Sequence, residues 1–240
     1  MEGIGIFMNK IIENIRKLKQ IKGAIFDLDG TLLDSMGVWS DVDRIFFARR
    51  GMEVPEDFIR TIAPLGFSAS AKYTINQFQL KEKEEDIVAE WQELAREAYA
   101  KQVKLKPYAK EYLEMLKKQN VSLAAATASD SALFEPCLIH NGIFDYFDTI
   151  VTVRDVTRGK GFPDIYYLAA EKIGLFPENC AVFEDILKGI EGAKIGGFLA
   201  IGVEDLHSAF EKEFILEYAD IYIKSWKELL EEELESSKFT

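Results

Sequence analysis

Two pairs of acidic residues each follow a short apolar run of the chain. The pairs are Asp27 with Asp29 and Glu184 with Asp185. Carboxylates that gather in one place repel one another and raise each other's pKa, and a divalent cation relieves this repulsion. Because oxygen ligands of this kind suit Mg²⁺, the two pairs predict a magnesium site, provided that the fold brings them together.

Three further residues are suited to holding an anion beside these carboxylates. Lys160 lies in a loop before Pro163, and Thr127 and Ala128 follow another apolar run. A lysine and a metal ion can screen the charge of a phosphate group in an acidic site. The hydroxyl and backbone N–H groups at Thr127 and Ala128 can hold the remaining phosphate oxygens, although Thr127 also suits a plain β-branched strand position.

Phosphoryl transfer is the chemistry that this set of residues fits. One aspartate can attack phosphorus and form an aspartyl phosphate, which divides one difficult step into two. A second carboxylic acid nearby can protonate the leaving oxygen and then activate water. Residue types alone do not assign these two roles to particular acids.

The elements that must position these residues are short apolar runs that alternate with helical stretches. The runs cover residues 23–27, 121–127, 149–152, 180–183, 198–203 and 221–223. Runs without polar alternation suit strands buried on both faces of a parallel sheet. Together with helical patterns such as 108–119 and 165–173, they predict an α/β fold with a doubly wound parallel sheet. Ligands of such sheets bind at the carboxyl ends of the strands, where the acids and Lys160 would meet.

An inserted module separates the first two expected strands. The intervening residues, 28–120, are far more than one crossover helix needs, and apolar side chains recur in them at helical spacing. We therefore expect a helical cap domain over residues 34–106, inserted into an α/β core of residues 1–33 and 107–240. Its aromatic stripes are more typical of a domain core than of a ligand site.

The charge of the chain excludes several classes of partner. Lys and Arg number 29 and Asp and Glu number 41, which gives a formal charge of −12. Nucleic-acid backbones and anionic membranes require basic patches, so neither is an expected partner. No apolar run is long enough for a membrane span. We expect a cytoplasmic monomer with a small phosphorylated metabolite as its partner.

Cysteine and histidine contribute little to these expectations. Cys137 and Cys180 do not make a disulfide framework and are expected to be buried thiols. The only two histidines, His140 and His207, exclude a Cys/His zinc pattern. At the start of the chain, residues 8–20 predict a short amphipathic helix that leads into the first strand.

The stretch FDLDGTLLDS over residues 26–35 resembles the first motif of the haloacid dehalogenase superfamily. The later signals follow in the order of that family: Thr127, then Lys160 with Pro163-Asp164, then Phe183-Glu184-Asp185 with Gly189-Ile190 and Ala193. The match runs from about residue 23 to residue 203, and the inserted module takes the place of the family's helical cap. Within the superfamily, the chain is most similar to the β-phosphoglucomutase-like phosphatases.

This resemblance implies a role for each acid. Asp27 would be the nucleophile and a metal ligand, and Asp29 would be the general acid and base, with its backbone carbonyl on the metal. Asp185 would bind Mg²⁺ directly, and Glu184 directly or through water. Lys160 would neutralise the nucleophile as well as hold phosphate.

The same resemblance implies how the remaining residues act. Thr127 would hold phosphate together with Lys160, which agrees with the interpretation of the residue types given above. Apart from the resemblance, the position of Asp164 directly after Pro163 suits either the orientation of Lys160 or a cap of the following helix, and the sequence does not choose between these roles.

Three functions are compatible with the motifs: a phosphatase, a sugar phosphomutase of the β-phosphoglucomutase type, and a binding protein without catalysis. The filled catalytic positions disfavour the binding protein, and Asp29 disfavours a dehalogenase. The mutase resemblance requires a histidine where this chain has Trp39 and an arginine where it has Ala69. Without that guanidinium, a strong second phosphate site is lacking, although Lys72 could replace it in part. Hydrolysis is therefore favoured.

The cap is expected to select the substrate. Its candidate substrate-facing residues are Trp39, Gly66, Phe67, Ser68 and Lys72. The residues near Trp39 and in the expected loop 64–68 are small or apolar, which indicates a compact metabolite of modest polarity.

Overall fold

A computed structural model of the chain describes residues 13–62 and 67–236. The chain divides into two compact units, one formed by residues 1–34 and 104–240 and the other by residues 35–103. The second unit therefore begins one residue later and ends three residues earlier than the expected cap.

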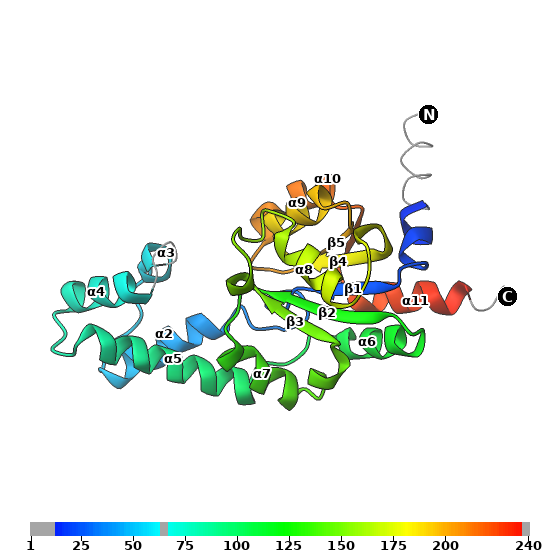
Figure 1. Ribbon diagram of the computed structural model, residues 1–240. Helices are drawn as coiled ribbons and strands as arrows, with labels where there is room; N and C mark the ends of the chain where they lie inside the picture. The colour runs from blue at the N-terminus through cyan, green and yellow to red at the C-terminus, as the bar shows by residue number, and fades with distance from the viewer. Residues whose placement is uncertain (1–12, 63–66, 237–240) are drawn as a thin grey trace. The chain divides into compact units, whose positions relative to one another are not determined.

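The first unit contains a six-stranded parallel sheet (Figure 1). Its strands are β1 (Gly23–Phe26), β2 (Ser122–Thr127), β3 (Thr149–Thr152), β4 (Cys180–Glu184), β5 (Leu199–Val203) and β6 (Ile221–Ile223). They lie in the order β3-β2-β1-β4-β5-β6, so the winding direction reverses at the central strand β1. This topology confirms the predicted doubly wound α/β fold and places the switch point between β1 and β4.

Burial explains which apolar runs became central strands. Every residue of β1 and β4 is buried, as expected for strands covered on both faces. The expectation of complete burial is wrong for β3, where only Val151 is buried, because β3 lies at an edge of the sheet. The edge strand β6 is likewise only partly buried.

Helices cover both faces of this sheet. They are α6 (Ala109–Lys118), α7 (Ser131–His140), α8 (Asp164–Lys172), α9 (Leu187–Ile195), α10 (Lys212–Tyr218) and α11 (Trp226–Ser236). Side chains alternate between the two faces of a strand, so Ile25 and Val182 pack with α8 residues such as Ile165 and Ala169. Phe26 and Phe183 project to the other face.

An aromatic cluster fills that second face. The rings of Phe26 and Phe183 stack with centroids 4.7 Å apart, and Trp226 at the start of α11 lies 5.8 Å and 5.3 Å from them. Tyr112 of α6 lies 5.2 Å from Trp226. The indole N–H of Trp226 donates to the carbonyl of Thr31 at 3.4 Å. The C-terminal helix therefore supports the loop that follows β1.

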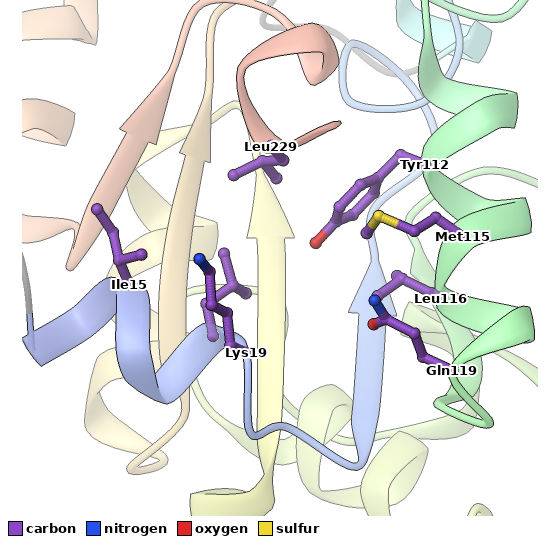
Figure 2. Close-up of a pocket in the computed structure, with 8 residues that line it drawn as sticks. Ile15, Lys19, Tyr112, Met115, Leu116, Gln119 and Leu229 are labelled. Carbon is purple, nitrogen blue, oxygen red and sulfur yellow. The ribbon is translucent and has the colours of Figure 1, made fainter. Parts of the chain in front are cut away.

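A helix over residues 13–18 packs at the amino end of the sheet; residues 8–12 of the expected helix lie outside the described residues. Asn14 anchors this helix through a 2.9 Å hydrogen bond from Nδ2 to the carbonyl of Asp220. Figure 2 shows Ile15 and Lys19 of this segment opposite Tyr112 and Met115 of α6, around a cleft of about 20 Å³. A cleft of this size holds about one water molecule, so it is too small for a metabolite.

The second unit consists of α2 (Val38–Arg49), α3 (Phe58–Ile62), α4 (Phe67–Phe78) and α5 (Glu84–Lys101). Its aromatic residues form its own core, as expected: Phe47 lies edge-to-face against Phe58 at 4.8 Å and against Phe78 at 5.0 Å, and Phe46 lies 5.2 Å from Trp91. Across the described parts of both units, no helix combines the length and apolarity needed to cross a membrane.

Candidate active site

The loop after β1 is built around two close approaches. Asp27 continues the strand, with its N–H donating to the carbonyl of Phe183 at 3.0 Å. Gly30 then adopts a φ of 84°, and a Cβ at this position would lie under 3.0 Å from the Asp185 carboxylate. Thr31 donates its hydroxyl to Asp185 Oδ1 at 3.0 Å. The glycine is therefore required by both its φ and the acid that lies against it.

Three acids meet at the carboxyl ends of β1 and β4. Asp27, Glu184 and Asp185 are all buried, and each offers a carboxylate oxygen within 4.8 Å of the others. Asp29 is half-buried and its carboxylate is not part of this trio. A contribution of Asp29 to metal binding through its backbone carbonyl remains a prediction.

Lys160 is the cation of this cluster. Its Nζ lies 2.7 Å from Glu184 Oε1 and forms an ion pair with Asp27 Oδ1. Burial opposes the charged ammonium, but the adjacent carboxylates of Asp27 and Glu184 outweigh it and hold the pKa of Lys160 above its usual range. The lysine is therefore fully charged at neutral pH.

One lysine does not compensate three buried acids. Burial raises the pKa of Glu184 to about 8 against the attraction of Lys160, with Asp27 and Asp185 adding repulsion. Burial and the charge of Asp27 raise the pKa of Asp185 to about 7, and burial also raises the pKa of Asp27. The shortage of positive charge is what a divalent cation would correct.

The donor set fits such a cation. All three side chains supply carboxylate oxygens, the preferred ligands of hard divalent metals. Glu184 Oε2 is buried without a hydrogen-bond partner among the described residues. A buried, unpaired carboxylate oxygen is costly unless a further cation or donor binds it. This acidic cluster could therefore hold a metal ion.

The expected phosphate-binding residues lie at the end of the neighbouring strand. Thr127 ends β2 and is completely buried, and its Oγ1 accepts a hydrogen bond from the backbone N–H of Ser129 at 3.0 Å. This contact leaves the hydroxyl proton to donate. Ala128 follows and is exposed. Their roles toward phosphate remain predictions.

Asp164, for which the sequence left two roles open, pairs with Arg158. The guanidinium Nε and Nη2 of Arg158 donate to the two carboxylate oxygens of Asp164 at 3.0 and 2.7 Å. This bidentate pair closes the loop that carries Lys160, and Asp164 is the first residue of α8.

Two glycines of α9 allow close packing around the acids of the site. A Cβ at Gly189 would overlap the Glu184 side chain, and one at Gly192 would overlap the carbonyl of Lys160. Both approaches are under 3.0 Å, which real Cβ atoms do not reach. Gly189 was part of the sequence motif, whereas nothing in the sequence indicated the role of Gly192.

We predict that Gly192→Ala destabilises the protein. In an ordinary helix this change stabilises by about 1 kcal/mol, but here the methyl group overlaps a backbone carbonyl, which costs about 1–3 kcal/mol. Urea denaturation measures the net change in the free energy of unfolding. Gly159→Ala in the same lysine loop is the control, because a Cβ there meets nothing within 4 Å. A Gly192→Ala variant more stable than the wild type would contradict the close approach.

Sequence reasoning also missed a tyrosine and an ion pair. The Tyr166 hydroxyl of α8 donates to Glu184 Oε1 at 2.8 Å in the buried interior. Lys106 Nζ lies 2.9 Å from Asp205 Oδ2 and donates to the carbonyl of Glu204 at 2.8 Å, after β5. The only sequence signal for Tyr166 is its position in a helix that is expected to be buried. The isolated Lys106 gives no sequence signal of its ion pair.

The candidate cap residues lie in the second unit. Trp39 of α2 and Phe67 at the start of α4 have ring centroids 5.5 Å apart. Ser68 is also helical and donates to Glu84, and Lys72 is exposed. The expected loop 64–68 is therefore helical from Phe67 onward, and Gly66 lies outside the described residues.

Comparisons with known proteins show which family model and which relatives the chain matches. The family model of haloacid dehalogenase-like hydrolases matches residues 21–197. A phosphorylated carbohydrates phosphatase of Thermotoga maritima is 28% identical, with 88% of this chain and 97% of the relative covered. A fructose-1-phosphate phosphatase of Escherichia coli is 30% identical, with 75% and 95% covered.

Solved structures show the same fold. A Thermotoga maritima protein assigned as a β-phosphoglucomutase superposes with a TM-score of 0.79 at 27% identity, covering 90% of this chain and 99% of that one. The similarity therefore extends over nearly the full length of that protein.

Proposed function

The chain belongs to the haloacid dehalogenase-like hydrolases, and on this premise we propose that it is a Mg²⁺-dependent phosphatase of small phosphorylated metabolites. The observation that carries the proposal is the buried cluster of Asp27, Glu184 and Asp185 around the Lys160 ammonium. The metal dependence of this family is consistent with an acidic cluster that could hold a metal ion. Mg²⁺ is the ion that we propose.

Asp27 is the proposed nucleophile. It lies at the switch point of the sheet, and Lys160 pairs with its Oδ1 and favours the ionised form. Attack of the carboxylate on phosphorus forms an aspartyl phosphate and breaks the bond to the leaving oxygen. A divalent cation held by Asp27, Glu184, Asp185 and the Asp29 carbonyl would supply positive charge for the phosphate oxygens.

Asp29 is the proposed acid and base. It protonates the leaving oxygen in the first step and takes a proton from water in the second, which releases inorganic phosphate. Thr127 through its hydroxyl, Ala128 through its backbone and Lys160 hold the phosphate oxygens during both steps. Trp39, Gly66, Phe67, Ser68 and Lys72 of the proposed cap select the rest of the substrate.

Phosphorylated sugars and sugar alcohols are the proposed substrates. The relatives named above act on phosphorylated carbohydrates and fructose 1-phosphate, and a further relative, 27% identical, is a hexitol phosphatase of Escherichia coli. We further propose that the protein acts as a cytoplasmic monomer.

A sugar phosphomutase is the second candidate, because a solved relative is assigned as a β-phosphoglucomutase. We predict phosphate release without isomerisation, because Trp39 and Ala69 leave the proposed cap without a strong second phosphate anchor. Purified protein with Mg²⁺ is incubated with hexose, ketose and hexitol phosphates, and phosphate and isomers are measured. Isomerisation of β-glucose 1-phosphate that exceeds hydrolysis and collapses in Lys72→Ala would establish the mutase instead.

A further inference from the structure

We propose that Tyr166 is a positioning residue that fixes the Glu184 carboxylate for cation binding, an inference that rests on the metal role proposed above for Glu184. Tyr166 lies on α8, outside the motif residues that the family resemblance marks. Its hydroxyl is the only polar atom of a side chain that otherwise belongs to the hydrophobic core.

The two carboxylate oxygens of Glu184 have different surroundings. Oε1 accepts a hydrogen bond from the Tyr166 hydroxyl at 2.8 Å and lies 2.7 Å from Lys160 Nζ. These two donors occupy both lone pairs of Oε1. Oε2 has no partner within the described part of the chain. The arrangement leaves Oε2 as the oxygen that a cation would take.

The tyrosine hydroxyl determines which of the two Glu184 oxygens stays available to a cation. The last torsion of a glutamate side chain is soft and nearly two-fold, so packing alone does not distinguish the two oxygens. Lys160 is shared with Asp27 and therefore holds Glu184 only in part. A second donor on the same oxygen fixes the plane of the carboxylate. Groups that orient a metal ligand typically change metal affinity 10- to 100-fold.

Packing fixes the ring but does not require the hydroxyl. Tyr166 is completely buried, its ring lies 6.1 Å from that of Phe198, and a Cβ at Gly192 would lie 3.1 Å from its Cε2. Phenylalanine would make the same apolar contacts. The hydroxyl is accommodated in this core because it reaches an acceptor, and that acceptor is a candidate metal ligand.

Direct metal binding tests the inference. Binding of Mn²⁺ to the full chain without substrate is followed by electron paramagnetic resonance for the wild type, Tyr166→Phe and Tyr167→Phe. Tyr167 is the matched control, because it is 44% exposed and its ring packs on the same Phe198 at 5.8 Å. We expect about 10- to 100-fold weaker binding for Tyr166→Phe and none of this loss for Tyr167→Phe. Thermal unfolding of the metal-free variants shows that the fold is kept.

A double-mutant cycle separates positioning from a general effect on the core. If Tyr166 acts through Glu184, Tyr166→Phe adds no further loss of Mn²⁺ affinity in a Glu184→Gln background. Wild-type affinity in Tyr166→Phe, or equal losses in both backgrounds, would overturn the positioning role and leave the proposed function intact. A wild-type protein that binds no Mn²⁺ would overturn both the metal role of Glu184 and the inference.

Discussion

The Asp27→Asn variant is expected to lose turnover by roughly 10⁴-fold or more while it keeps its fold, as is typical when a nucleophile is removed. The amide has the shape of the acid but neither its nucleophilic charge nor its full affinity for a cation. The fold should persist because Lys160 keeps its contact with Glu184, 2.7 Å away. The change also removes one charge from a crowded set of acids.

Phosphate release at saturating Mg²⁺ measures this loss, and circular dichroism checks the fold. The matched control is Asp41→Asn, which removes an exposed acid of α2 that pairs with the exposed Arg44 and has no proposed part in catalysis or binding. Exposed pairs of this kind contribute at most about 1 kcal/mol to stability, so turnover should remain close to that of the wild type. Near-normal turnover by Asp27→Asn, in a sample shown by intact mass to be free of deamidation, would assign the nucleophile to another residue.

The sheet and the acids at its edge could be predicted because both follow from local patterns. The run before Asp27 and the run before Glu184 are uniformly apolar, and strands of this kind are central in parallel sheets. Parallel strands share one carboxyl edge, so the acids that follow them meet there. The neighbouring position of β1 and β4 is then enough to bring Asp27 and Glu184 together.

Features that depend on packing between distant elements could not be predicted. The hydroxyl of Tyr166 meets Glu184 only because α8 lies on the same face of the sheet as that side chain. Gly192 lies in a helix, and a Cβ there is excluded because the carbonyl of Lys160 in the lysine loop lies against it. Helix α7 contains Pro136, a residue that local rules treat as a helix breaker.

Removal of the metal is expected to abolish phosphate release, and Mg²⁺ should restore it. Without a bound cation, the Lys160 ammonium must offset the charge of Asp27, Glu184 and Asp185, and a phosphate dianion would approach an acidic cluster. The interactions of a bound metal with the reacting phosphate supply several kcal/mol to catalysis. The rate of phosphate release should therefore fall by more than about 10²-fold. The assay compares excess EDTA with EDTA followed by Mg²⁺. Full phosphate release in EDTA, with metal content shown to be nil, would refute metal dependence.

The stability of the metal-free protein should show the same charge imbalance through its pH dependence. In the folded state, burial raises the pKa of Glu184 to about 8 and that of Asp185 to about 7. Between about pH 4 and pH 8 the unfolded chain therefore binds fewer protons at these groups, and their contribution to stability falls as pH rises. A cation stabilises the ionised acids, so Mg²⁺ should raise the melting temperature more at pH 8 than at pH 5.

Glu184→Gln removes one of the titrating acids and should flatten the pH profile of stability of the chelated protein. An unchanged profile in that variant, with equal stabilisation by Mg²⁺ at both pH values, would show that these acids are not the groups that the metal compensates.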